Sequence, residues 1–236
     1  MSLLSIVVEV SARLSLPKPS AVAGSSDRQV AQLMALVNEE GASLARRYAW
    51  QALVEEQTFA TVAAPAQTAA LPVDFDRFVP NSVFNRSTRR PMTGPITPRQ
   101  WQWIQAQPAY ASAYLAFRER SGQFLVSPTP AAGEVIAYEY LSKNWCLSGP
   151  SQTPPAVPQS GFIHDDDTAL IDESLISLGV RWRFLRAKGL DYSEEMATYE
   201  RELEQAVARD GGSTALSIAP RPAGLGRANI PDGSFG

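Results

Sequence analysis

The stretch LVEEQTFATV, which runs from Leu53 to Val62, decides the fold because the periodicity of the chain changes there. Alternate residues fall on two faces, and β-branched and aromatic residues are frequent. A period of two is typical of a β-strand. One face carries Val54, Glu56, Thr58, Ala60 and Val62. The stretch therefore predicts the point at which a helical region ends and a β-rich region begins.

Before this stretch, apolar residues recur at the spacing of a helix. Residues 3–14 and residues 28–49 each carry one apolar stripe, which predicts two amphipathic helices. Asp27 offers an N-cap for the second helix. Gly41 inside that helix costs about 1 kcal/mol relative to alanine, so it indicates either a weak point or the close approach of another helix.

After Val62, short runs between turn residues continue to about residue 164 and predict an antiparallel β domain. Ser121-Gly122 has the spacing of a tight hairpin, and residues 130–133 mark the next turn. Thr97-Pro98 predicts the start of a short helix that ends near Ala106. Residues 148–160, with four prolines, predict a loop.

Helical spacing returns at residues 168–188, where Gly189 supplies a C-terminal stop. Asp191 and Glu194 have the spacing of a capping box for a further helix that ends near residue 210. Residues 211–236 hold too few apolar side chains to fold alone and predict an extended arm.

Together these patterns predict the α+β class. The economical arrangement is a helical domain formed by residues 1–60 and 165–210, with a β-rich antiparallel domain over residues 61–164 inserted into it. An extended C-terminal arm over residues 211–236 completes the prediction.

Composition excludes several classes of protein. The 236 residues carry a formal net charge of −3, which gives no global attraction for nucleic acid or acidic lipid. No window holds the roughly 20 apolar residues of a membrane span, so we expect no membrane partner. Because the chain has one cysteine and one histidine, an intrachain disulfide is impossible and a structural zinc site is not expected. Arginine outnumbers lysine 18 to three, which suits interfaces but equally follows from a GC-rich genome.

Few residues are candidates for catalysis or metal binding. His164 and the following Asp165, Asp166 and Asp167 have the ligand types for Mg²⁺ or Mn²⁺, but acidic residues before a helix more often cap it, and that interpretation is favoured. Cys146 has no second imidazole to activate it, so a structural role is expected. No P-loop, dinucleotide turn or serine elbow is present in the sequence. We therefore predict a protein that is not an enzyme and holds neither cofactor nor metal.

Arginine-rich segments are candidate contact surfaces. Arg86, Arg89 and Arg90 form the densest basic cluster, which predicts either a phosphate contact or a solvated or subunit-contacting loop tip. The helix that carries Arg181, Arg183 and Arg186 is apolar on more than one side, so it lies deep in a core or faces a neighbouring copy. In the second case these arginines pair with acidic residues of the adjacent subunit, among them Glu194 and Glu202.

Aromatic residues offer one more surface. Trp101, Trp103, Tyr110 and Tyr114 form either a glycan-binding platform or, as is more usual, core or interface material.

The order of several segments is more specific than any of them alone. It resembles the head-to-tail adaptor proteins of short-tailed bacteriophages, also called connector, tail tubular or gatekeeper proteins, over residues 45–200. The matching segments are RRYAWQAL (46–53), LPVDFDRF (71–78), RPMTGPI (90–96), YEYLSKNW (138–145), DTALIDE (167–173) and GLDY (189–192).

The resemblance implies a structural virion protein of the neck, assembled in the bacterial host cytoplasm. Family members form a ring, generally a dodecamer, below the portal protein; the ring extends the DNA channel without sequence-specific binding and supports the tail nozzle. It also implies that the arm docks on the portal through Leu216, Ile218, Leu225, Ile230 and Phe235. The alternative is a receptor- or glycan-binding tail module, and a small hydrolase built around His164 is a third reading.

Overall fold

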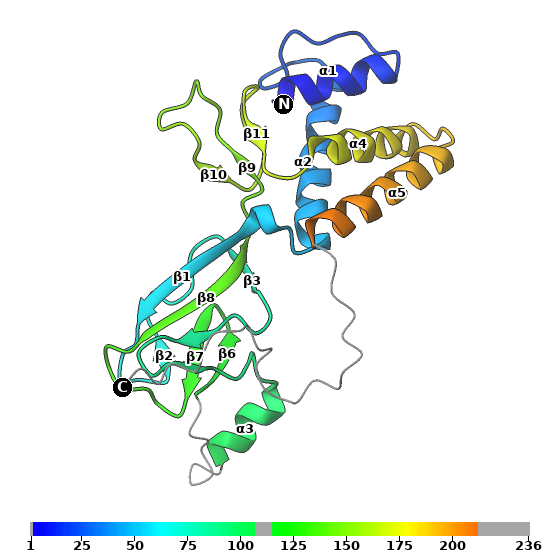
Figure 1. The fold of residues 1–236 in the computed structure, drawn as a ribbon. Coiled ribbons are helices and arrows are strands. Elements are labelled where there is room, and N and C mark those ends of the chain that lie inside the picture. The colour runs from blue at the N-terminus through cyan, green and yellow to red at the C-terminus, as the bar shows by residue number, and fades with distance from the viewer. Residues whose placement is uncertain (1, 107–114, 212–236) are drawn as a thin grey trace.

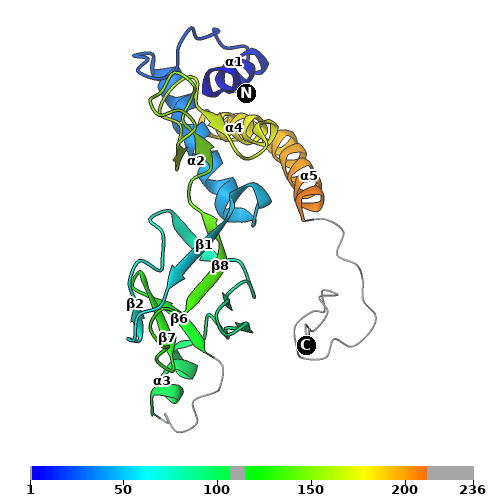
Figure 2. The same ribbon diagram turned by 60° about the vertical axis from the view of Figure 1, so that its left-hand side comes forward.

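The computed structural model describes residues 2–106 and 115–211, which form two lobes joined by a narrow neck (Figures 1 and 2). Helices α1, α2, α4 and α5 lie at one end, and the large sheet lies at the other with α3 at its tip. This mixture of helices and antiparallel sheets confirms the α+β class. The limits of the domains and their arrangement stay a prediction.

The helical lobe is built around α2 (Arg28–Arg47), which packs against α1 (Leu3–Arg13) and α4 (Glu173–Ala187). The expected stripes form its core, where Leu3, Ile6, Leu33 and Leu44 are fully buried. Asp27 caps α2 as predicted, since its carboxylate accepts from the Gln29 N–H at 2.7 Å.

A hairpin of α4 and α5 (Ser193–Asp210) completes this lobe. Gly189 ends α4 with a positive φ of 70°, as the sequence predicted, because only glycine enters this conformation at little cost. The first residues of α4 and α5 differ from the sequence-based expectation. The α4 helix begins after Asp172, which caps it, and α5 begins after Tyr192, while Asp191 accepts from the Ser193 N–H at 3.0 Å.

The β lobe contains two antiparallel sheets. The longest strands, β1 (Val54–Ala60) and β8 (Val135–Ser142), pair over their whole length from Val54 opposite Leu141 to Ala60 opposite Val135. The first sheet has the order β1-β8-β4-β5, with β3 also on β8, and the second has the order β2-β7-β6. The other strands are β2 (Ala66–Gln67), β3 (Phe75–Phe78), β4 (Phe84–Asn85), β5 (Arg90–Pro91), β6 (Ala116–Arg120) and β7 (Gln123–Ser127).

Aromatic rings fill the space between these sheets. Phe124 stacks on Phe117 at a centroid distance of 5.2 Å and lies 5.8 Å from Tyr138. The predicted hairpin is confirmed between β6 and β7, where Ser121 and Gly122 both have positive φ. The predicted short helix is α3 (Pro98–Ala106).

The segment after β8 returns to the helices. Its strands are β9 (Cys146–Leu147), β10 (Pro158–Gln159) and β11 (Thr168–Ala169), in the order β10-β9-β11. Trp145, Cys146 and Phe162 belong to the helical core, although the sequence grouped them with the β-rich region. The start of the chain holds the segment there, because the Leu3 N–H donates to the Asp167 carbonyl at 2.9 Å.

Gly41 explains how Trp145 reaches the helical core. A Cβ at this position would lie 2.2 Å from Cη2 of Trp145 and 2.4 Å from its Cζ3. The glycine therefore lets a fully buried indole lie directly on the α2 backbone. The close approach that the sequence indicated is real, but the approaching group is a side chain between β8 and β9 and not another helix.

Candidate functional site

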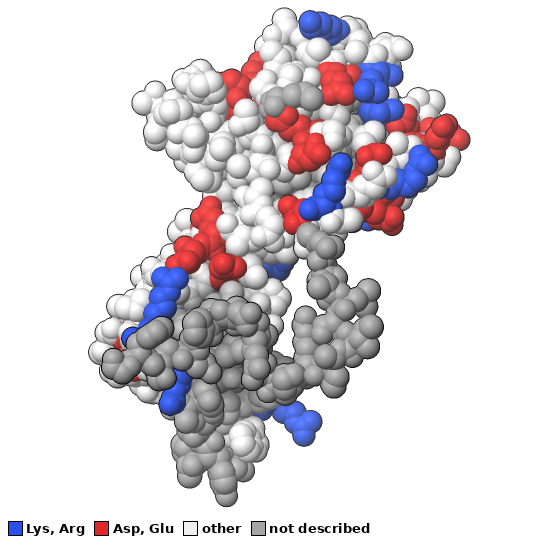
Figure 3. Space-filling view, viewed as in Figure 1, with Lys and Arg blue, Asp and Glu red and all other residues white. Residues whose placement is uncertain are grey.

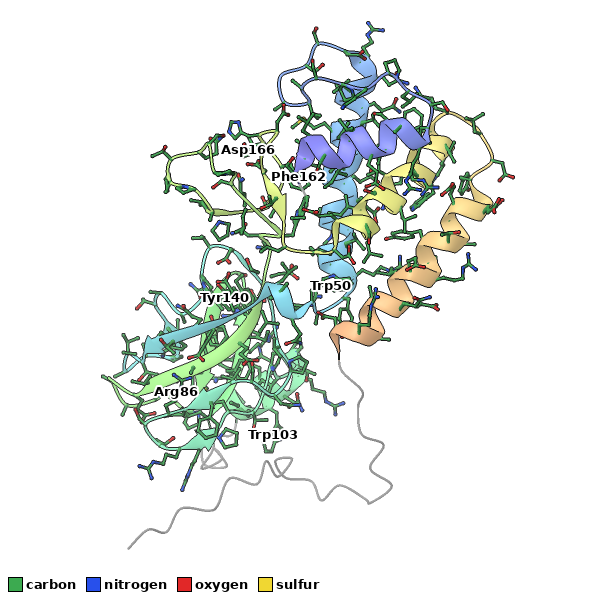
Figure 4. The ribbon with its side chains drawn as sticks, turned by 45° about the horizontal axis from the view of Figure 1, so that its top comes forward. Trp50, Arg86, Trp103, Tyr140, Phe162 and Asp166 are labelled. Carbon is green, nitrogen blue, oxygen red and sulfur yellow. The ribbon has the colours of Figure 1, made fainter. Side chains whose placement is uncertain are left out.

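The three aspartates after His164 serve a structural role. Its three carboxylates accept hydrogen bonds from three separate groups of backbone N–H. Asp165 accepts from Val22 and Ala23 at 3.0 and 2.6 Å, Asp166 from Ser151 at 2.8 Å, and Asp167 from Gly149, Ile163 and His164 at 3.0, 2.7 and 2.8 Å. Figure 4 labels Asp166 and Phe162 on the segment that lies beside α1 and α2.

These bonds bind the carboxylates to the fold. The hydroxyl and N–H of Ser151 hold the pKa of Asp166 below its ordinary value. Asp167 is fully buried, and it does not cap α4, whose N-cap is Asp172, five positions further along the chain. Within residues 2–106 and 115–211, no group of three or more histidine, cysteine and acidic residues could hold a metal ion.

Cys146 is likewise part of the packing. It is fully buried, and its thiol donates to the Gln159 carbonyl at 3.2 Å. Burial, with a smaller contribution from the charge of Asp167, raises the pKa of the thiol to about 12. Because the thiolate is the reactive form, this residue has little nucleophilic character at neutral pH.

A buried ionic network ties three helices together. Glu40 of α2 has no exposed surface; it accepts from Arg183 of α4 and, at 2.6 Å, from the Tyr199 hydroxyl of α5. Arg183 also donates to Glu39. Gly179 makes room for the carboxylate, since a Cβ there would lie 2.2 Å from Cδ of Glu40. Burial and the bond to Glu40 raise the pKa of Tyr199.

Two of the arginines predicted to contact another subunit already have partners within their own chain. Arg181 and Arg183 bind carboxylates of their own chain, and Glu195 is the partner of Arg181. Arg186 and Glu194, in contrast, are exposed and make no ion pair in the described part of the chain. Glu202 is half-buried. Whether these five residues meet a second subunit stays a prediction.

The predicted basic cluster lies on the β lobe. Arg86 follows β4 and donates to Glu56 of β1 at 2.6 Å, with both side chains about half exposed. Arg89 sits in the turn between β4 and β5 with a positive φ of 55°, and Arg90 begins β5. All three are exposed. Whether they stay solvated or contact a phosphate or another subunit stays a prediction.

The aromatic set does not come together in the described residues. Trp101 is buried, whereas Trp103 on the same helix is 54% exposed (Figure 4). Tyr110 and Tyr114 lie outside the described residues. The rings of the β lobe, such as Phe124 and Tyr138, are buried in its core.

A comparison with known protein families tests the resemblance that the sequence suggested. The family model described as SU10 adaptor protein matches residues 1–224. The chain belongs to the SU10 adaptor protein family. This confirms the resemblance to phage head-to-tail adaptors, and it supports a structural role as a virion component that associates with portal and tail components in general. No curated protein matches the chain in sequence.

The match extends into the expected arm of this adaptor. It includes Leu216 and Ile218 and ends before Leu225, Ile230 and Phe235, and all five lie outside the described residues. Among the described helices, none is both long and apolar enough to cross a membrane.

Sequence reasoning missed one surface of this adaptor. Residues 144–163, here called the neutral segment, contain no Asp, Glu, Lys or Arg, and they form the white lobe beside α1 and α2 in Figure 3. Val157 is 42% exposed, and Ile163, the last residue of the segment, is 56% exposed. A run of 20 uncharged residues in a chain that is 19% charged was the available signal.

Proposed function

We propose that this protein is a non-enzymatic adaptor whose copies form a ring, a dodecamer by resemblance, below the portal of a phage. The ring extends the DNA channel, which DNA crosses without sequence-specific binding, and it supports the tail nozzle. The protein assembles in the bacterial host cytoplasm. Its membership of the adaptor family supports this role.

One observation carries the proposal: the carboxylates and the thiol that the sequence offered for chemistry hold the fold together. The carboxylates of Asp165, Asp166 and Asp167 accept backbone N–H groups, and Cys146 is buried as a thiol. The protein therefore acts through its surface, by contacts with other proteins, as an adaptor does.

Two opposite sides of the helical lobe supply the ring contact. The neutral segment lies on one side of α2, and the turn between α4 and α5 lies on the other (Figures 1 and 2). Leu190 in that turn is 56% exposed and Met196 at the start of α5 is 38% exposed, and Arg186 and Glu194 of the same two helices are also exposed. A contact between unlike sides of successive copies is heterologous, and such contacts close into rings.

The remaining predicted contacts serve neighbouring virion parts. Residues 211–236 dock on the portal, and they leave the helical lobe at the end of α5, where Asp210 accepts from the Gln51 N–H at 3.0 Å. The basic tip with Arg86, Arg89 and Arg90 faces the nozzle or the DNA.

The test is to mix purified full-length protein with purified portal and to measure particle mass and projection images. Rings on the portal are expected for the full chain, and no attachment is expected for a chain that ends at Gly211. Attachment without the arm would overturn arm docking.

A pair of variants tests the ring contact itself. Leu190→Asp should prevent ring formation, because it places a charge in the apolar contact, while Val73→Asp on the β lobe should not, since Val73 is fully exposed there. Rings that persist in Leu190→Asp would contradict the assigned face, and sugar binding by the isolated chain would favour the tail-module alternative.

A further inference from the structure

A pocket at the neck is a candidate binding site beyond ring formation. It has a volume of about 220 Å³ and lies where α2 meets the junction of β8 and β9. The residues that line it are Ala42, Ala45, Arg46, Asp76, Ser142, Lys143, Trp145 and Ser160.

The pocket joins an apolar part to a cationic part. Ala42 and Ala45 lie on one face of α2, and Trp145 is the indole that packs on Gly41. A cavity on the order of 150 Å³ holds a benzene ring, so this pocket has room for one aromatic or branched aliphatic side chain.

The cationic part comes from both lobes. Arg46 lies in the last turn of α2 and Lys143 follows β8; both are exposed, and in the described ranges neither side chain has a carboxylate partner. The nearby carboxylate of Asp76 is already paired with Arg77 at 2.8 Å. The Asp74 carboxylate accepts from the hydroxyl of Ser142 in the pocket wall at 2.6 Å. An incoming carboxylate therefore meets two available cations, while both nearby carboxylates already have partners.

We propose that this pocket binds a peptide segment of a partner protein that presents an apolar side chain beside a carboxylate. The apolar side chain packs against the pocket wall formed by Ala42, Ala45 and Trp145, and the carboxylate bridges Arg46 and Lys143. A phosphodiester backbone has no apolar group for the inner part of the pocket, so nucleic acid fits less well.

Occupation of the pocket has a mechanical consequence. The two lobes already touch at this neck, where Arg77 of β3 donates to the Tyr48 carbonyl at 3.2 Å. A ligand held by both Arg46 and Lys143 adds a further link between the lobes and restricts their relative motion.

The experiment uses full-length protein labelled with fluorotryptophan and observed by ¹⁹F NMR. The Trp145 signal is assigned with Trp145→Phe. Three probes separate the ligand chemistries: phenylpropionate carries a ring and a carboxylate, phenylpropionamide carries the ring without charge, and inorganic phosphate carries charge without a ring. A short single-stranded DNA is the fourth probe.

Phenylpropionate should shift the Trp145 signal saturably, with about tenfold higher affinity than phenylpropionamide, and phosphate and DNA should leave it unchanged. Arg46→Gln combined with Lys143→Gln should lower the phenylpropionate affinity to that of the amide. The matched control, Lys18→Gln combined with Arg28→Gln, removes the same charge from exposed positions elsewhere and should change nothing.

Three results would overturn the proposal: equal binding of acid and amide, an equal shift with phosphate or DNA, or unchanged phenylpropionate binding in the double variant. Circular dichroism checks that both double variants are folded, which is expected because the altered side chains are exposed. The ring proposal is tested separately by particle mass, so the two can fail independently.

Discussion

Replacement of Gly41 by alanine tests the packing that joins the segment after β8 to the helices. In an ordinary helix interior this change stabilises by about 1 kcal/mol. Here the new Cβ would lie 2.2, 2.4 and 2.5 Å from three atoms of the Trp145 ring, whereas carbon atoms in contact lie about 3.5 to 4.0 Å apart. The ring has to move by more than about 1 Å, and its edge-on contact with Phe162 at 4.9 Å leaves little space.

Overpacking of this kind costs up to about 3 kcal/mol, so the net loss of unfolding free energy is about 2 kcal/mol. For a chain of this length the loss corresponds to a fall in melting temperature of roughly 4 to 8 °C. Thermal and urea denaturation followed by circular dichroism measure it.

A double-mutant cycle separates the clash from other effects. Trp145→Leu alone should destabilise by about 3 kcal/mol, since it removes a buried ring. In that background Gly41→Ala should be neutral or stabilise by up to about 1 kcal/mol, because helix propensity acts without the clash. If Gly41→Ala instead stabilises the unmodified chain, the placement of Trp145 on α2 is wrong.

Three further predictions concern the groups that hold the fold. Arg183→Gln should lower the unfolding free energy by about 3 kcal/mol in urea titrations, because it leaves the buried carboxylate of Glu40 without its cation; Tyr199→Phe should cost only about 1 kcal/mol, and equal costs would refute the assignment. The Cys146 thiol should not react with Ellman's reagent in the folded protein at mildly alkaline pH and should react fully in urea, since its pKa is raised to about 12; rapid reaction of folded protein would contradict its burial. Asp166→Asn should be less stable than the unmodified protein at neutral pH, because the stabilisation exists only while the Asp166 carboxylate is ionised. The difference in unfolding free energy should vanish as the pH falls through the lowered pKa of Asp166, which lies below its ordinary 3.8. A difference that persists at lower pH would show that charge is not the cause.

Local patterns predicted most of the helices and the main hairpin. The stripe that ends in Leu44, the cap at Asp27 and the stop at Gly189 depend on residues a few positions apart, so the sequence contains the whole signal. The turn at Ser121-Gly122 is local in the same way.

Partners that lie far apart in the chain were not predictable from these patterns. The sequence left open whether Arg183 lies in a core or faces a neighbouring subunit, and it did not indicate the buried partner Glu40, which is 143 residues away. Asp167 was expected to cap a helix, but it binds three loop N–H groups that only the folded chain brings together. The neck pocket has the same origin, since Arg46 and Lys143 come from different lobes.

The most direct test of the structural role is immunogold labelling of intact virions with an antibody against this chain. The account predicts label at the junction of head and tail. Label confined to the tail tip or fibres would contradict it. Virions that carry no label, with the protein found only in the host cell, would contradict it as well.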